Sequence, residues 1–222
     1  MSSILFSAVL LELLSLSAPG EPMKGGVCTP PVTLYTDFKE DHSQRSFEAM
    51  KEEVGTTLAA AGIQVQWRSL RISQSEITSG DLVVVSFTGK CRMNDLFLPR
   101  VESGPLGWTY VEDGHTSPFS NVDCDRIRAF INPLIPDTGR DDREALLGRA
   151  LGRVLVHELY HVFSDSRGHA SQGLCSGLFT ARYLLLDHAR LDEKDVSTFR
   201  NGELRRLFGR KHIAQAPPGG CQ

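Results

Sequence analysis

Two histidines and a glutamate near the middle of the chain have the residue types and the spacing for metal-assisted chemistry. His157, Glu158 and His161 follow the pattern H-E-x-x-H. Residues four apart on an α-helix lie one turn apart on the same face, so the two imidazoles can bind one ion. Glu158 lies about 100° further round such a helix, where its carboxylate can accept a proton from water without binding the ion itself. Imidazole nitrogens suit zinc better than magnesium or calcium, so the pattern predicts a zinc site beside a general base.

These side chains need a helix to carry them, and the preceding sequence favours one. The segment from Arg143 to Phe163 contains no proline and no turn cluster. Asp141 followed by Glu144 predicts a helix N-terminus with a reciprocal capping pair. Gly148 and Gly152 mark a side of this helix where another element can pack closely. We therefore expect one long helix that ends soon after the second histidine.

A helical wheel places the chemistry on the apolar side of this helix. His161 and Glu158 fall within the apolar arc, and Arg149 and Arg153 lie outside it. Ionisable groups on a buried face are costly unless they are paired or bind metal. The arrangement therefore favours a metal site over a chance match on an exposed helix. The apolar positions of the arc are Leu146, Leu147, Ala150, Leu151, Val154 and Leu155.

The chain before this helix predicts the sheet on which the helix packs. A helix capped by Asp41 or Ser43 and ending at Gly62 is expected between the first two strands. This β-α-β-β order favours an α+β fold with a mixed, mainly parallel sheet backed by helices. Strands are predicted at Val32–Thr36, Ile63–Trp67, Asp81–Phe87, Gly107–Val111 and Arg126–Asn132.

Residues 88 to 125 form a long, mostly irregular stretch around one predicted strand, Gly107–Val111. Irregular stretches of this length are often functional. If the strand lies at an edge of the sheet, an extended peptide can pair with it and present its carbonyls to the metal. A surface loop closed by a disulfide is the alternative reading of the same stretch.

A catalytic zinc site needs a third protein ligand besides two histidines. Ser164 to Gly168 form a dense helix-stop cluster, and Gly168 permits a left-handed turn that can reverse the chain. His169 follows this turn and is the expected third ligand, with Asp165 and Asp187 as alternatives.

Two tyrosines, Tyr160 and Tyr183, follow the first motif histidine in the sequence. Tyr160 points away from the metal by its angle on the wheel. Tyr183, on a helix predicted from Leu178 to His188, is close enough in sequence to assist an oxyanion, but nothing beyond this proximity favours it.

Composition and the first residues bound the domain organisation. The chain has 222 residues, 41% hydrophobic and 23% charged, which suits one globular core. Its net charge of -3 gives no reason to expect a nucleic-acid partner. The apolar run from Ile4 to Ala18 has the length of a signal peptide and is too short to span a membrane, although an N-terminal helix packed on the domain is the alternative. We expect a signal peptide at 1–20, a linker at 21–30, the catalytic domain at 31–213 and a disordered tail at 214–222, and hence a secreted or periplasmic protein of undetermined oligomeric state.

The cysteines are consistent with export. None of the five is arranged as C-x-x-C, so a thiolate zinc site is not expected. Their odd number leaves one thiol without a partner in the chain, and a bond between Cys91 and Cys124 is one expected pairing. The five are Cys28, Cys91, Cys124, Cys175 and Cys221.

Taken together, the motif helix, the β-α-β-β order, a possible edge strand and the histidine after a glycine turn resemble the metzincin-like zinc metallopeptidases. The resemblance covers roughly residues 31–190, but only the motif helix is specific. The family pattern is H-E-x-x-H-x-x-G-x-x-H, and His157, Glu158 and His161 match its first three functional positions.

The chain departs from the family pattern after the second histidine. Ser164 stands at the glycine position, and Arg167 stands at the third histidine position. His169 comes two residues later, so its turn must be longer than the family's. The family's methionine turn has no counterpart, because no methionine follows Met93.

The resemblance implies a zinc-dependent endopeptidase that acts on a protein or peptide substrate. Zn²⁺ would be held by His157, His161 and His169, and Glu158 would take a proton from water and pass it to the leaving amine. One alternative is a catalytically inactive zincin-fold domain that binds metal or protein, suggested by the shifted third ligand. A metal-free core with hydrogen-bonded histidines is the other.

Overall fold

A single five-stranded sheet supports the molecule, in the order β2-β1-β3-β5-β4. The computed structural model describes residues 31–71, 82–93, 101–137 and 139–202, so the predicted signal peptide, linker and tail lie outside the described residues. All neighbouring strands are parallel except β4, which runs antiparallel to β5 at the edge. This is the mixed, mainly parallel sheet expected from the sequence. The strands are β1 (Val32–Phe38), β2 (Val65–Ser69), β3 (Leu82–Thr88), β4 (Gly107–Glu112) and β5 (His115–Asp123).

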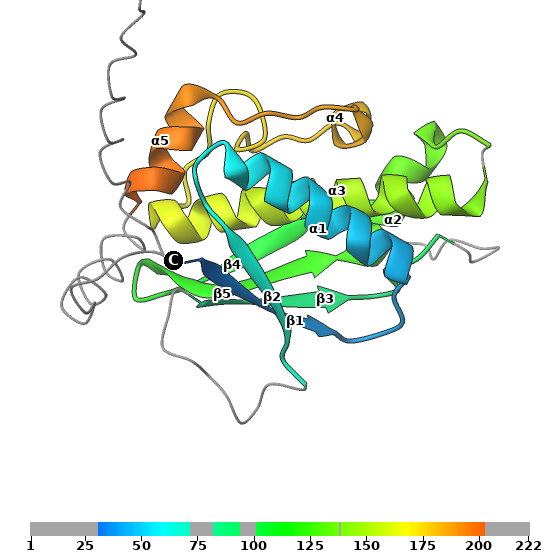
Figure 1. Cartoon of the computed structure of the whole chain (residues 1–222), viewed down its shortest axis with the longest axis horizontal. Coiled ribbons are helices and arrows are strands. Elements are labelled where there is room, and N and C mark those ends of the chain that lie inside the picture. Colours follow the sequence, from blue (N-terminus) through cyan, green and yellow to red (C-terminus); the bar gives the residue numbers. More distant parts are fainter. Residues whose placement is uncertain (1–30, 72–81, 94–100, 138, 203–222) are drawn as a thin grey trace, which may run out of the picture.

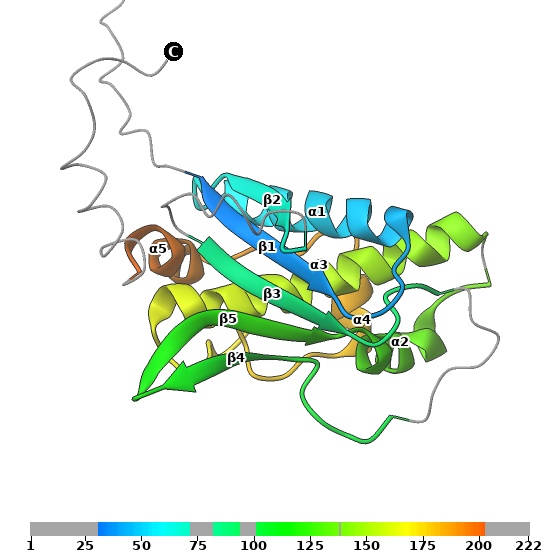
Figure 2. The ribbon, with the colours of Figure 1, turned by 90° about the horizontal axis from the view of Figure 1, so that it is seen from below.

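Helices cover one face of this sheet. Figure 1 shows the two long helices, α1 and α3, side by side above the strands, and Figure 2 shows the sheet from below. No helix among the described residues is long and apolar enough to cross a membrane. The helices are α1 (Gln44–Ala59), α2 (Cys124–Ile131), the 3₁₀ helix η1 (Asn132–Leu134), α3 (Arg140–Ser164), α4 (Ala181–Leu185) and α5 (Glu193–Asn201).

The contact between α1 and α3 depends on two glycines of α3. A Cβ atom on Gly148 would lie 2.3 Å from the carbonyl oxygen of Ser46, and one on Gly152 would lie 2.9 Å from Cβ of Glu53. Larger residues would therefore push the helices apart. The expected close approach on the glycine side of α3 is confirmed, and it fixes the helix against the core formed with the inner face of the sheet.

The prediction of a strand at Arg126–Asn132 is wrong, because this segment forms helix α2 and the beginning of η1. Asp123 caps α2 by accepting a hydrogen bond from the backbone nitrogen of Arg126 at 3.0 Å. The missing strand is β5, which pairs with β4 across a two-residue turn. Asp113 and Gly114 in this turn have φ angles of 51° and 84°, as a tight hairpin turn of this kind requires.

The predicted start of the long helix also needs correction. α3 begins at Arg140 after Gly139, and Asp141 lies in its first turn instead of capping it. Glu144 is buried and does not close a capping pair. Its carboxylate accepts hydrogen bonds from Oγ of Ser46 at 2.6 Å and from the backbone nitrogen of Met93 at 2.9 Å.

Two further predictions, on the exposure of Arg153 and on the helix around Tyr183, are wrong. Arg153 was placed outside the buried arc, yet its side chain is fully buried because α1 and the chain around α4 cover it. The helix predicted from Leu178 to His188 is reduced to α4, Ala181–Leu185.

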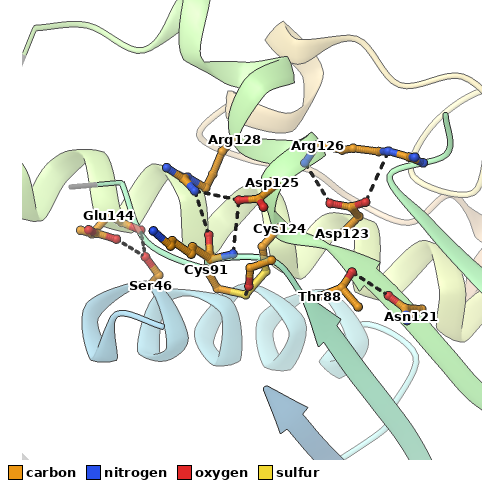
Figure 3. The surroundings of a disulfide bond; sticks show 12 residues. Ser46, Thr88, Cys91, Asn121, Asp123, Cys124, Asp125, Arg126, Arg128 and Glu144 are labelled. Atoms are coloured by element: carbon orange, nitrogen blue, oxygen red, sulfur yellow. Dashed lines mark hydrogen bonds and ion pairs between the residues drawn. A yellow bond between two sulfur atoms is a disulfide. The ribbon is translucent and has the colours of Figure 1, made fainter. Parts of the chain in front are cut away.

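The disulfide between Cys91 and Cys124 is confirmed and joins the chain after β3 to the first residue of α2 (Figure 3). Beside it, the fully buried guanidinium of Arg128 donates to the Asp125 carboxylate at 2.8 Å and to the Lys90 carbonyl at 3.4 Å. Cys175 is a buried free thiol, and Cys28 and Cys221 lie outside the described residues.

Candidate metal and active site

The C-terminal half of α3 brings the two motif histidines together on one face. His157 and His161 are 6% and 8% exposed, and their Nε2 atoms lie 3.2 Å apart. The buried apolar residues between and around them belong to the main core, so the helix is held rigidly at this point. The one-turn spacing has therefore produced the juxtaposition that the sequence predicted.

The loop after α3 returns to the histidines by a turn at Asp165, and not at Gly168 as expected. Asp165 has a φ of 47° and ends the helix in the left-handed conformation, which aspartate tolerates better than most residues. Gly168 does not have a positive φ. The turn thus comes earlier than predicted and leaves more chain for the return.

The returning loop orients both helix histidines through hydrogen bonds with their Nδ1 atoms. Nδ1 of His161 donates to the carbonyl of Ser166 at 2.7 Å, and Nδ1 of His157 donates to the carbonyl of Leu174 at 2.9 Å. Such bonds set the ring orientation and the tautomer of a metal-binding histidine. In both rings Nε2 is then the atom that carries the free lone pair.

The same loop carries His169 to the two helix histidines. The His169 ring stacks on His157 at 5.1 Å between centroids and meets His161 edge-on at 4.8 Å. One ligand atom from each of the three side chains lies within 4.8 Å of the other two, so the cluster could hold a metal ion. Gly177 makes room for His169, because a Cβ there would lie 3.2 Å from the ring.

The two acidic alternatives lie elsewhere. Asp165 accepts hydrogen bonds from the backbone nitrogen of Thr116 at 2.6 Å and from Nδ1 of His115 at 2.7 Å. Asp187 is 87% exposed and pairs with Arg149 at 3.1 Å. Among the described residues, His169 is the candidate that groups with the helix histidines.

The electrostatics of the cluster suit a cation. Burial lowers the pKa of His157 to about 4 and also lowers the pKa of His161, so both rings are neutral at neutral pH. With Nδ1 donating in each ring, the two Nε2 lone pairs face each other at 3.2 Å and have no proton to share. A positive ion between them would relieve this repulsion, and the neutral imidazoles are in the correct state to bind it.

Glu158 lies beside the histidines and is only 4% exposed. Oγ1 of Thr109, on strand β4, donates to its Oε2 at 2.9 Å. Burial raises the pKa of Glu158 to about 7, and the hydrogen bond from Thr109 opposes this rise. A carboxyl group with such a pKa can both accept and release a proton near neutral pH.

A cleft of about 510 Å³ opens over the cluster. Strand β4 forms one wall and lies at the edge of the sheet, one of the two possibilities that the sequence left open for this stretch. Tyr160 does not line the cleft, which agrees with the prediction that it points away from the metal, and its ring contacts that of Phe199. Tyr183 also does not line the cleft, and its ring stacks on that of Phe179 at 6.5 Å between centroids, so the structure does not favour a role for it. The lining residues are Gly104 to Thr109, Val111, Thr116, Phe130, His157, Glu158, His161, Arg167, His169 and Gly177 to Phe179.

Several residues of the site had no individual signal in the sequence. Thr109 contacts Glu158, and the carbonyls of Ser166 and Leu174 orient the histidines. Backbone carbonyls carry no side-chain signature. The register that places Thr109 against α3 depends on strand β5, which was not predicted.

Comparison with known proteins adds little. No protein-family model matches the chain, and no curated protein matches it. Among solved structures, the chain is similar to a zinc-dependent peptidase from Methanocorpusculum labreanum (strain Z). The two are 12% identical, with a TM-score of 0.47, over 76% of this chain and 99% of that chain. A likeness this distant carries no argument about function.

Proposed function

We propose that the protein is a zinc-dependent endopeptidase with His157, His161 and His169 as ligands and Glu158 as general base. The observation that carries the proposal is the convergence of three imidazoles beside a buried carboxylate at the floor of a cleft. Two nitrogens each ~2.05 Å from one tetrahedral ion lie ~3.3 Å apart. The 3.2 Å between the Nε2 atoms of the helix histidines agrees with this value.

A zinc ion held there supplies Lewis-acid chemistry, because it lowers the pKa of water and polarises a peptide carbonyl. Residues of the chain transfer the proton and orient the metal ligands. Glu158 accepts the proton of the attacking water and donates it to the leaving amine. The carbonyls of Ser166 and Leu174 hold the imidazoles in the tautomer that leaves Nε2 free. The methionine turn of the metzincin-like peptidases has no counterpart, so the resemblance remains to the wider zincin group.

The substrate we propose is a protein or peptide in extended conformation. Within the described residues strand β4 is paired on one side, with β5, and its other edge is available there for a further strand. The cleft lies along this strand, and its wall includes the apolar side chains of Leu106, Trp108 and Phe130. These features suit binding of several consecutive substrate residues.

The first test is metal content together with hydrolysis. Purified protein should contain about one zinc per chain by mass spectrometry and should digest casein in a chelator-sensitive manner that added zinc restores. Zinc without hydrolysis would favour the alternative, a catalytically inactive zincin-fold domain that binds metal or protein. Neither zinc nor hydrolysis would reject the proposal.

We also propose that the protein acts outside the cytoplasm, in the secreted or periplasmic space. The disulfide between Cys91 and Cys124 supports this, because such bonds persist in oxidising compartments. Sequencing the N-terminus of the mature protein tests it. Cleavage near residue 20 is expected, and an intact N-terminus in the cytoplasmic fraction would contradict it.

A further inference from the structure

We propose that Thr109 is a positioning residue for Glu158, and that Ser120 supports it from the neighbouring strand. The two hydroxyls fix one oxygen of the carboxylate and leave the other for the reaction. This inference rests on the proposed function, because it assigns a role to Thr109 through the general base.

Three short contacts join β5, β4 and α3 at this point. Oγ1 of Thr109 lies 2.9 Å from Oε2 of Glu158 and 3.1 Å from the backbone carbonyl of Glu158. Oγ of Ser120 lies 3.0 Å from Oγ1 of Thr109. Thr109 and Ser120 are directly paired residues of the antiparallel strands, so both side chains point to the face that α3 covers.

The direction of these hydrogen bonds follows from the number of protons. A hydroxyl donates one proton, and an ionised carboxylate can only accept. The carbonyl of Glu158 lies inside α3, where the backbone nitrogen four residues later can satisfy it. The Thr109 proton is therefore best used on Oε2. Ser120, which is 2% exposed, then donates to Thr109 and orients its hydroxyl.

The other oxygen of Glu158 lies against Gly107. A Cβ on Gly107 would lie 3.0 Å from Oε1, 2.9 Å from Val154 and 2.9 Å from the carbonyl oxygen of Asn121. Gly107 and Thr109 are two residues apart on one strand and so face the same side. No described residue donates a hydrogen bond to Oε1, and both Glu158 and Gly107 line the cleft. Strand β4 thus anchors Oε2 and leaves space beside Oε1.

This arrangement predicts a kinetic role and not only a structural one. A glutamate has three side-chain torsions, and a general base must hold its oxygen within hydrogen-bonding distance of the proton that it takes. Loss of the Thr109 hydroxyl would let the carboxylate occupy positions that are wrong for the transfer. The number of bound metal ions should not change, because Thr109 contacts none of the three histidines through a hydrogen bond.

The experiment compares Thr109→Val and Thr109→Ala, which remove the hydroxyl, with Thr109→Ser, which keeps it. With the zinc-loaded protein, kcat should fall roughly 10- to 100-fold in the Val and Ala variants, with KM and zinc content close to wild type. Thr109→Ser should stay near wild type, and Ser120→Ala should cause a smaller fall. Val and Ala differ in bulk, so either variant that folds is sufficient.

Two controls separate this inference from the proposed function. Crystal structures of the variants should show a displaced or divided Glu158 carboxylate in Thr109→Val and a wild-type position in Thr109→Ser. This readout needs no activity, so it decides the inference even if the wild-type protein hydrolyses no peptide, a result that would reject the proposed function alone. In a Glu158→Asp background, Thr109→Val should have little further effect on kcat, because the shorter side chain has already lost the contact. An undisturbed carboxylate in Thr109→Val, or equal losses in Thr109→Val and Thr109→Ser, would overturn the inference.

Discussion

Helix α3 buries charged or ionisable side chains in two regions, and the two regions use them differently. In the first, Glu144 and Arg153 are buried and their polar atoms meet groups of the protein. Glu144 accepts from Ser46 and Met93. Arg153 donates to the Glu53 carboxylate at 2.7 Å and to two carbonyls of the chain around α4.

In the second region, His157, Glu158 and His161 are also buried, but only part of their hydrogen-bonding capacity is used within the protein. One hydrogen bond orients each side chain on the side away from the cleft. His157 donates to the carbonyl of Leu174, His161 donates to the carbonyl of Ser166, and Glu158 accepts from Thr109. The outer atoms, Nε2 of the histidines and Oε1 of the glutamate, lie at the cleft. Burial of charge alone therefore does not distinguish a site from a structural network. The distinguishing feature is a set of oriented side chains whose free lone pairs, on Nε2 of the histidines and Oε1 of the glutamate, converge at the cleft.

Removal of a helix histidine should have the largest effect on the second region. His157→Ala and His161→Ala should each abolish stoichiometric zinc binding, because two remaining ligands hold the ion weakly. Metal analysis of the purified variants by mass spectrometry measures this. Arg149→Ala, on the same helix, should keep its zinc. If both histidine variants retain one zinc per chain, α3 does not carry the metal site.

A second test exchanges the two buried glutamates of α3 for glutamine. Glu158→Gln should keep zinc yet lose roughly 10²- to 10⁴-fold in kcat, because it removes the base and leaves the ligands. Glu144→Gln should keep turnover and lose roughly 1–3 kcal/mol of unfolding free energy, because an amide replaces a carboxylate that accepts two buried hydrogen bonds. Peptide hydrolysis and urea unfolding of both variants measure the contrast. Near wild-type turnover in Glu158→Gln would show that Glu158 is not the general base.

How far the sequence could predict these regions depends on the range of the interactions. The spacing of His157, Glu158 and His161 is local, so their common face on a helix followed directly. The buried pairing of Arg153 was missed because its partner Glu53 is 100 residues away and lies on α1. A helical wheel describes one helix and contains no information about which neighbours cover it.

The strand order shows the same limit. The β-α-β-β order predicts the mixed sheet and periodicity predicts the strand at Gly107–Val111, whose edge position was only one possibility. The strand predicted at Arg126–Asn132 is a helix, and the strand at His115–Asp123 was not predicted. Asp113-Gly114 is a hairpin-turn signal that could have located β5. His169, the expected third ligand, does group with the other two histidines, although the turn that brings it there is made by Asp165.

The structural region of α3 can be tested through Arg153. Arg153→Met should lower the unfolding free energy by roughly 3 kcal/mol, because it leaves the Glu53 carboxylate and two carbonyls without their donor. Arg149→Met is the matched control and should lose less, since Arg149 is more exposed. Urea unfolding measures both. Equal stability of the two variants would mean that the buried network contributes nothing beyond packing, and folded Arg153→Met should still bind zinc.

The smallest expected effect concerns Asp165. The sequence offered it as an alternative metal ligand, but in the structure its carboxylate forms hydrogen bonds with Thr116 and His115. Its hydrogen bond with His115 and those from Thr116 lower the pKa of Asp165 in the folded protein. The ionised carboxylate therefore stabilises the fold above the unfolded pKa of ~3.9, and this stabilisation is lost as the pH falls through the lower folded pKa. Asp165→Asn keeps a residue that tolerates the left-handed turn but removes the charge. Metal-free Asp165→Asn should therefore be about 1 kcal/mol less stable than wild type at pH 6, and the difference should shrink as the pH falls below ~3.9. Urea unfolding across this pH range measures it.

Chelator competition at pH 7 should show unchanged zinc affinity in Asp165→Asn and in Asp187→Ala, and strongly weakened affinity in His169→Ala. The reverse ranking would make an aspartate the third ligand and leave His169 as a neighbour of the site.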